Sequence, residues 1–110
     1  MPESPERSAL TEAVYYILLS LYREPRHGYA MMQEISRMSH GRVNLGPGTL
    51  YGALNTLEEK GWICAMGPGM GNRKKEYMLT AAGAAVLAGA MERLAELVQT
   101  GIHIVKGGAE

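Results

Sequence analysis

Apolar residues recur at helical spacing in the first third of the chain and predict two helices. The first is expected from Leu10 to Tyr22, where residues fall at offsets of zero, three, four and seven, the spacing of one helix face. These residues are Val14, Ile17, Leu18 and Leu21. Pro25 prevents this helix from continuing. The second helix is expected from about Gly28 to Met38, and its inward side is expected to carry Tyr29, Met32 and Ile35.

The strongest helical pattern follows the Gly-Pro-Gly sequence that begins at Gly46. Apolar residues again fall at offsets of zero, three, four and seven, which places them on one helix face; they are Leu50, Ala53, Leu54 and Leu57. Pro47 suits the first turn of a helix, and Gly61 after Lys60 suits a helix end. A third helix is therefore expected between Gly46 and Gly61.

A β-hairpin and a long last helix complete the pattern. Trp62 to Met66 and Glu76 to Leu79 are strand-compatible runs, separated by a segment rich in glycine and ending in basic residues. Thr80 suits the cap of a helix that extends to about Lys106. The chain is thus expected to divide into a flexible N-terminal arm (residues 1–9), a folded domain (10–79), a long helix (80–106) and a tail (107–110).

This element order predicts the fold class and a DNA-binding geometry. Three helices followed by a hairpin with a basic tip form a winged helix-turn-helix, here mainly α with a small β-hairpin and a long C-terminal helix. In this geometry a recognition helix enters the major groove, and a flexible cationic loop can lie along the neighbouring backbone or minor groove.

The composition fits one soluble globular domain. The chain has 110 residues, of which 46% are hydrophobic and 20% charged. No apolar run approaches the about 20 residues that span a bilayer, and no signal peptide is visible. Cys64 is the single cysteine, so no internal disulfide can form and a cytoplasmic protein is expected. We expect Cys64 to be a buried structural thiol, with a redox sensor as the alternative.

Charge is unevenly distributed along the chain. The formal net charge is zero, yet the segment from Arg23 to Lys75 carries eight basic residues and four acidic ones. Arg73, Lys74 and Lys75 follow five Gly, Pro and Met residues at the hairpin tip. This placement favours contact with a phosphate backbone, and a solvated basic turn is the alternative.

The outward face of the third helix is suited to base edges. Its expected surface residues are mostly small and polar, with Tyr51 at the flank, and they are Thr49, Gly52, Asn55, Thr56 and Glu59. The free backbone N–H groups of Gly48 and Thr49 in the first turn could meet a phosphate. An ordinary amphipathic helix is the alternative interpretation.

The last helix predicts a homodimer. It would measure about 40 Å at about 1.5 Å per residue, whereas a small domain is about 30 Å across, so part of it must protrude. Its apolar residues follow spacings close to a coiled-coil seam, and these residues are Leu87, Met91, Leu94, Val98, Ile102 and Val105. A second copy is the simplest cover for this stripe, and folding back onto its own domain is the alternative.

The sequence offers no catalytic constellation. His27, His40 and His103 are too scattered for a metal motif, and the glycine-rich segments lack the third glycine of a dinucleotide fingerprint and the lysine of a phosphate-binding loop. No nucleophile and base pair can be named. We therefore expect no enzyme, no cofactor and no metal.

Three stretches together resemble the PadR family of bacterial transcriptional regulators. They are R-H-G-Y-A from Arg26, G-T-L-Y-G-A-L-N-T-L-E-E-K-G-W from Gly48, and R-K-K-E-Y-M-L-T-A-A-G from Arg73. The resemblance covers roughly residues 10–100 and is closest to the compact subfamily with one helix after the wing. It implies a homodimeric repressor on an inverted-repeat operator, with DNA contacts carried over to Thr49, Tyr51, Asn55 and Arg73 to Lys75.

Two features depart from this pattern. About eight residues separate the second and third helices, more than the three or four of a compact helix-turn-helix, so the crossing angle is open. Gly52 stands where a larger side chain could contact DNA. Together with the zero net charge, Gly52 supports a second hypothesis: a winged-helix dimer that binds a protein or a small molecule and has no DNA affinity.

The resemblance also raises the question of an effector. Some relatives bind flat hydrophobic molecules or phenolic acids between the dimerisation helices and the body of the domain. The last helix here carries no aromatic residue. Tyr15, Tyr16 and Tyr22 on the first helix, together with Trp62, could supply rings to such a site if they face the same cavity, and packing in the core is their alternative role.

Overall fold

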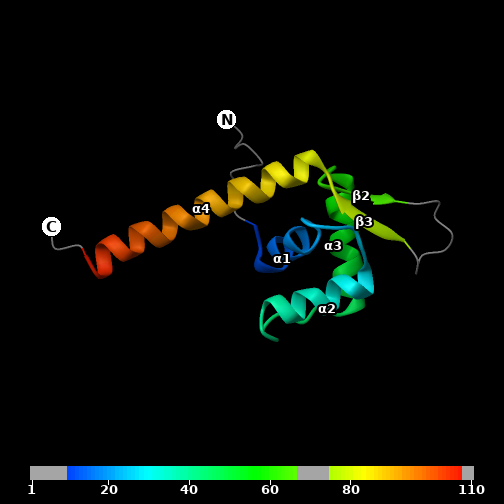
Figure 1. Cartoon of the computed structure of the whole chain (residues 1–110), viewed down its shortest axis with the longest axis horizontal. Helices are drawn as coiled ribbons and strands as arrows, with labels where there is room; N and C mark the ends of the chain where they lie inside the picture. Colours follow the sequence, from blue (N-terminus) through cyan, green and yellow to red (C-terminus); the bar gives the residue numbers. More distant parts are fainter. Residues whose placement is uncertain (1–9, 67–74, 108–110) are drawn as a thin grey trace.

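The computed structural model describes residues 10–66 and 75–107. Along the chain the elements are α1 (Glu12–Ser20), β1 (Arg26–His27), α2 (Gly28–Met38), α3 (Pro47–Glu59), β2 (Ile63–Met66), β3 (Glu76–Leu79) and α4 (Ala81–Val105). The first three helices and the sheet form one body, and α4 runs away from it (Figure 1). The long axis of the molecule measures 60 Å. The predicted winged-helix class is confirmed.

α1 is shorter than expected at both ends. Thr11 has an extended backbone, and its hydroxyl oxygen accepts a hydrogen bond from the Val14 N–H at 3.1 Å. The helix therefore begins at Glu12 and not at Leu10. It ends at Ser20, and the following Leu21 still packs in the core.

α2 has the expected bounds but a rotated inner face. Gly28, Met31 and Ile35 are its buried residues, whereas Tyr29 is 67% exposed. The placement of Tyr29 on the inward side was wrong. Gly28 faces inward instead, and the ring of Tyr51 lies so close to it that there is no room for a side chain.

The sheet has a third strand that the sequence did not predict. β1 pairs antiparallel with β3, so the strand order is β1-β3-β2. A strand of two residues is too short to show an alternating pattern, so the sequence pattern does not predict β1. In β2 the alternation turns Ile63 into the core and leaves Cys64 exposed. The expectation of a buried thiol was therefore wrong.

The core lies between the three short helices, the inner face of the sheet and the first half of α4. α3 contributes Leu50, Leu54 and Leu57 to it, as the periodicity predicted, and Ala53 is half-buried. The other large buried residues are Ile17, Leu18, Met31, Ile35, Ile63, Tyr77, Val86 and Leu87. The four helices, β2 and β3 of the described residues thus each bury apolar side chains, and this burial is the main stabilising contribution in a domain of this size.

The start of α4 is fixed to the turn between α3 and β2. The Thr80 hydroxyl donates to the Gly61 carbonyl at 2.6 Å and accepts from the Gly83 N–H at 3.0 Å. Gly83 lies so close to this turn that a β-carbon there would be 2.0 Å from the Trp62 carbonyl oxygen. From Met91 onward every described residue of α4 is exposed, so the helix protrudes as expected.

Candidate nucleic-acid interface

The exposed face of α3 carries the predicted DNA-contacting side chains. Thr49, Asn55 and Thr56 are exposed, and Gly52 has open space around its α-carbon. The helix starts at Pro47 with Gly46 as N-cap, and no side-chain hydrogen bond caps it. The first turn, which includes Gly48 and Thr49, therefore has backbone N–H groups available to an anion.

The long connection between α2 and α3 is internally ordered. The buried Ser39 accepts a hydrogen bond at its Oγ from the Val43 N–H at 2.9 Å. Asn44 donates from Nδ2 to the Gly41 carbonyl at 2.7 Å, and Gly41 has a φ of +79° that favours glycine. These contacts fix the entry into α3 despite the eight residues between the helices.

Tyr51 is anchored on α2. An ideal β-carbon at Gly28 would lie 2.2 Å from the Tyr51 Oη and 2.6 Å from its Cζ, so the phenol rests directly on the first turn of α2. The residue keeps 37% of its surface exposed. Tyr51 therefore joins the two helices of the helix-turn-helix and also presents an edge to solvent.

Tyr77 of β3 is a buried residue of the core. Burial raises the pKa of its phenol, and the charges of Glu58 and Tyr51 raise it further. Tyr77 is therefore neutral at ordinary pH and serves the core.

The base of the wing is tied to α2 through β1. The register places His27 opposite Glu76, and the two side chains approach to 3.7 Å between Nε2 and Oε2. Lys75, the first described residue after the tip, holds its Nζ 5.7 Å from the centre of the Tyr77 ring. Arg73 and Lys74, the other predicted wing contacts, lie outside the described residues.

Several cations of the basic segment are paired with carboxylates. Arg26 approaches Glu24 at 3.4 Å, and Arg42 approaches Glu12 at 3.5 Å. Arg37 binds Glu34 through two hydrogen bonds, and this contact lowers the pKa of the Glu34 carboxyl. These pairs partly neutralise the local surplus of basic residues on the described surface.

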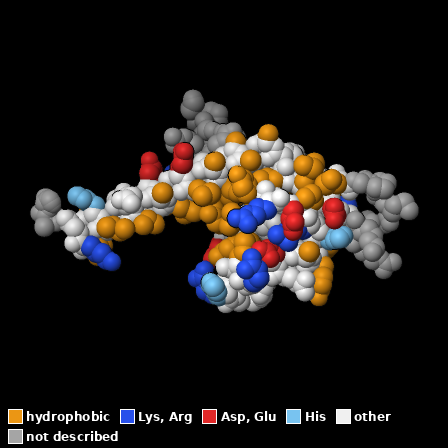
Figure 2. All heavy atoms as spheres, in the orientation of Figure 1, with side chains coloured by type: hydrophobic (Ala, Val, Ile, Leu, Met, Phe, Trp, Pro, Cys, Tyr) orange, Lys and Arg blue, Asp and Glu red, His pale blue; other side chains and the backbone are white. Residues whose placement is uncertain are grey.

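The protruding half of α4 carries an exposed apolar stripe. Its members are Met91, Leu94, Val98, Ile102 and Val105, which are 46–79% exposed. Figure 2 shows hydrophobic side chains gathered along this half of α4, on the side toward the body. Leu87, predicted as the first seam residue, belongs instead to the core of its own chain, because α4 is still docked on the body at that point. Leu97 and Ile104 widen the exposed apolar surface.

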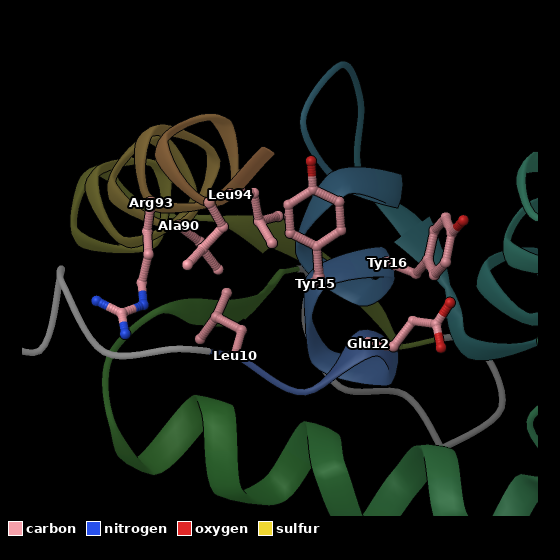
Figure 3. A pocket seen from close by; sticks show the side chains of 8 residues that line it. Leu10, Glu12, Tyr15, Tyr16, Ala90, Arg93 and Leu94 are labelled. Carbon is pink, nitrogen blue, oxygen red and sulfur yellow. The ribbon is translucent and has the colours of Figure 1, made fainter. Parts of the chain in front are cut away.

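A cavity of about 340 Å³ lies between α1 and α4 (Figure 3). In this view Tyr15 lies between Leu94 and Tyr16, and the two tyrosine rings meet edge to face at 6.1 Å. The lining residues are Leu10, Glu12, Tyr15, Tyr16, Ala90, Arg93, Leu94 and Leu97. Trp62 is not among them, because it sits in the turn between α3 and β2 beside Lys60. Tyr22 is not among them either, because it lies exposed in the turn between α1 and β1. The structure thus brings two of the four predicted rings to one site.

Comparison with known proteins assigns the family. The model of the PadR-like family of transcriptional regulators matches residues 17–89. An uncharacterised 37.1 kDa protein of a Streptomyces fradiae transposon is 36% identical over 86 residues, or 78% of this chain, and the chain spans only 24% of that protein.

Solved structures share the fold. A PadR-like transcription factor from Bacteroides fragilis is 27% identical with a TM-score of 0.70, over 84% of this chain and 89% of that one. Bacillus subtilis PadR in complex with operator DNA is 23% identical with a TM-score of 0.61, over 74% of this chain and 46% of that one.

No helix of the described residues is long and apolar enough to cross a membrane. The matched family consists of regulators and not of enzymes. With its recognition helix, wing and protruding last helix in place, the chain belongs to the PadR-like family of transcriptional regulators.

Proposed function

We propose that this regulator is a homodimeric, ligand-responsive repressor that binds an inverted-repeat operator. The observation that carries the proposal is the pair of contacts that connects the recognition helix, through the start of α2, to the wing strand. Tyr51 of α3 rests on Gly28, and the adjacent His27 is paired with Glu76 of the wing strand β3. Such a connection presents a helix and a wing to one duplex in a fixed relation, which sequence-specific recognition requires. The same fold in Bacillus subtilis PadR holds operator DNA.

Different residues have different roles in this proposal. Thr49 and Asn55 read base edges from the exposed face of α3, and Tyr51 contributes its exposed edge. The backbone N–H groups of Gly48 and Thr49 bind a phosphate. Arg73, Lys74 and Lys75 of the wing neutralise phosphates and supply most of the salt-sensitive affinity.

A second copy of the chain covers the exposed stripe on α4. Five exposed apolar residues share one helix face, and a contiguous apolar surface of this kind marks an interaction site. Pairing of two copies about a two-fold axis would present two recognition helices, and an inverted-repeat operator has the matching symmetry.

The cavity between α1 and α4 is the proposed effector site. Its apolar lining and the rings of Tyr15 and Tyr16 suit a small hydrophobic or phenolic molecule. Leu94 belongs both to this cavity and to the exposed stripe. An effector in this cavity therefore contacts a residue of the proposed dimer interface. Through that contact it changes the distance between the two recognition helices.

The experiment that tests the DNA proposal is fluorescence anisotropy with the protein's own upstream promoter fragment and a scrambled duplex, at two salt concentrations. We expect tight, promoter-selective binding that weakens steeply with salt. Replacing Arg73, Lys74 and Lys75 together by Ala should weaken binding to all sequences and reduce the salt slope. Asn55→Ala should instead change the preference among sequences.

Equal and weak binding to both duplexes would contradict the proposal. It would favour the alternative, a winged-helix dimer that binds a protein or small molecule without DNA affinity. The zero net charge and the carboxylate-paired Arg26, Arg37 and Arg42 support that alternative. Retention on heparin at low salt separates the two, because only the DNA-binding protein should be retained.

A further inference from the structure

α2 presents a large exposed side chain that packing does not explain. Tyr29 is 67% exposed although its helix is short and otherwise buries its apolar residues well. One turn later, Gln33 donates a hydrogen bond from Nε2 to the Tyr29 Oη at 3.4 Å. The pair thus forms a polar surface whose hydroxyl is held by a neighbour.

The two residues that precede Tyr29 contact two other elements. The preceding Gly28 lies under Tyr51 of the recognition helix. The residue before that, His27, pairs with Glu76 on the wing strand β3. Tyr29 therefore stands where α2 meets both the recognition helix and the base of the wing, the two parts that the proposed function brings to DNA.

The chemistry of the pair suits a phosphate oxygen. The Tyr29 oxygen accepts the hydrogen bond from Gln33, so its own hydrogen is free to be donated outward. The remaining amide hydrogen of Gln33 is a second donor. Tyrosine and glutamine are regular donors to the DNA backbone, and a tyrosine loses little conformational freedom on binding because it has only two side-chain torsions.

We infer that Tyr29 and Gln33 form a second DNA contact, which binds the phosphate backbone beside the base pairs that α3 reads. This inference rests on the proposed function and extends it to a helix that the sequence analysis had not assigned to DNA. The contact positions α3 in the groove and carries no base readout of its own.

The test compares single-site variants on the same promoter duplex by fluorescence anisotropy. Tyr29→Phe removes only the hydroxyl and should weaken binding about tenfold, since a hydrogen bond to a charged group is being lost. Gln33→Ala should weaken binding about threefold. Tyr22→Phe is the matched control, because Tyr22 is 64% exposed but lies in the turn between α1 and β1, and its binding should equal that of the unaltered protein.

Two further readouts separate a backbone contact from other roles. The loss in Tyr29→Phe should be equal for the promoter and the scrambled duplex, and the salt slope should not change, because no charge is removed. Thermal unfolding should be unaltered, since the ring is exposed and keeps its shape.

The outcomes distinguish this inference from the proposed function. If the unaltered protein binds its promoter and Tyr29→Phe binds equally well, the second contact is wrong and the proposed function stands. If Tyr22→Phe loses as much affinity as Tyr29→Phe, the effect is not local and the inference also fails. If the unaltered protein binds no duplex, both proposals are wrong.

Discussion

Gly28 and Tyr51 are in such close contact that a β-carbon on residue 28 would lie 2.2 Å from the Tyr51 hydroxyl oxygen. The missing side chain allows the phenol of the recognition helix to rest on the first turn of α2. The residue before Gly28, His27, pairs with the wing strand β3, and the residue after it is the exposed Tyr29. This contact is therefore the point at which α2, α3 and the wing are held together.

Gly28→Ala should displace Tyr51 and destabilise the domain by about 1–3 kcal/mol, the usual range for an overpacked site. Chemical denaturation measures the change. Gly52→Ala is the control, since it has open space within an exposed turn of α3 and should stabilise the domain by about 0.5–1 kcal/mol through helix propensity. A second change, Tyr51→Ala, should remove most of the additional penalty of Gly28→Ala. Equal stability of the two glycine variants would contradict this explanation.

Gly83→Ala should be more damaging, because the obstacle there is backbone. A β-carbon at this position would be 2.0 Å from the Trp62 carbonyl oxygen and 2.8 Å from Leu79 Cδ1. We expect a loss of about 3 kcal/mol, at the upper end for overpacking, in the same denaturation assay. Trp62→Ala should not rescue this variant, since the carbonyl oxygen stays in place. Rescue would mean that α4 docks through side chains alone.

The raised pKa of Tyr77 predicts that the free energy of unfolding decreases at alkaline pH. Burial and the charge of Glu58 raise the pKa of the phenol above its ordinary value of 10.0. The folded state thus favours the neutral phenol. This preference adds to the free energy of unfolding below about pH 10, and the added stability is lost as pH rises through the folded pKa. Unfolding in denaturant over an alkaline pH series should show a steeper loss for the unaltered protein than for Tyr77→Phe.

Glu58→Gln should make the alkaline loss shallower, because one of the two charges that oppose phenolate formation is removed. A profile for Tyr77→Phe that runs parallel to that of the unaltered protein would show that other groups control alkaline unfolding.

Cys64 should react in the folded protein. Its side chain points out of the sheet while the adjacent Ile63 is buried. We expect one equivalent of thiol to react with DTNB under native conditions, at a rate within about an order of magnitude of that in denaturant. Reaction only after unfolding would restore the interpretation of a buried thiol.

The proposed dimer requires the exposed apolar stripe of α4 as its interface. Val98→Glu places a charge at a 58% exposed apolar position and should convert the dimer to a monomer without unfolding the body, as measured by light scattering during size-exclusion chromatography. Gln99→Glu adds the same charge one residue further along, where the side chain is also exposed but off the stripe, and should leave the dimer intact. A monomeric unaltered protein, or a dimeric Val98→Glu variant, would contradict the prediction.

Local patterns accounted for much of the architecture. Offsets of three and four residues identified the helices of residues 10–66 and 75–107, and Leu50, Leu54 and Leu57 were correctly placed inside because a helix face depends only on spacing. Capping chemistry located the start of α4 at Thr80. The exposed residues of α3 followed from the same argument as its buried ones.

The sequence by itself therefore determined the order of the helices and of the two hairpin strands, the inward face of α3 and the protruding apolar helix, since these depend on residues close together in the chain. Only the tertiary structure decided which side of α2 is buried, where β1 pairs, that Leu87 stays in the core and that Trp62 lies away from the tyrosine cavity. Each of these depends on a contact between segments far apart in the sequence, such as Gly28 with Tyr51. Periodicity within one segment contains no information about its partner, so the site at the junction of α2, α3 and the wing became visible only once the chain was folded.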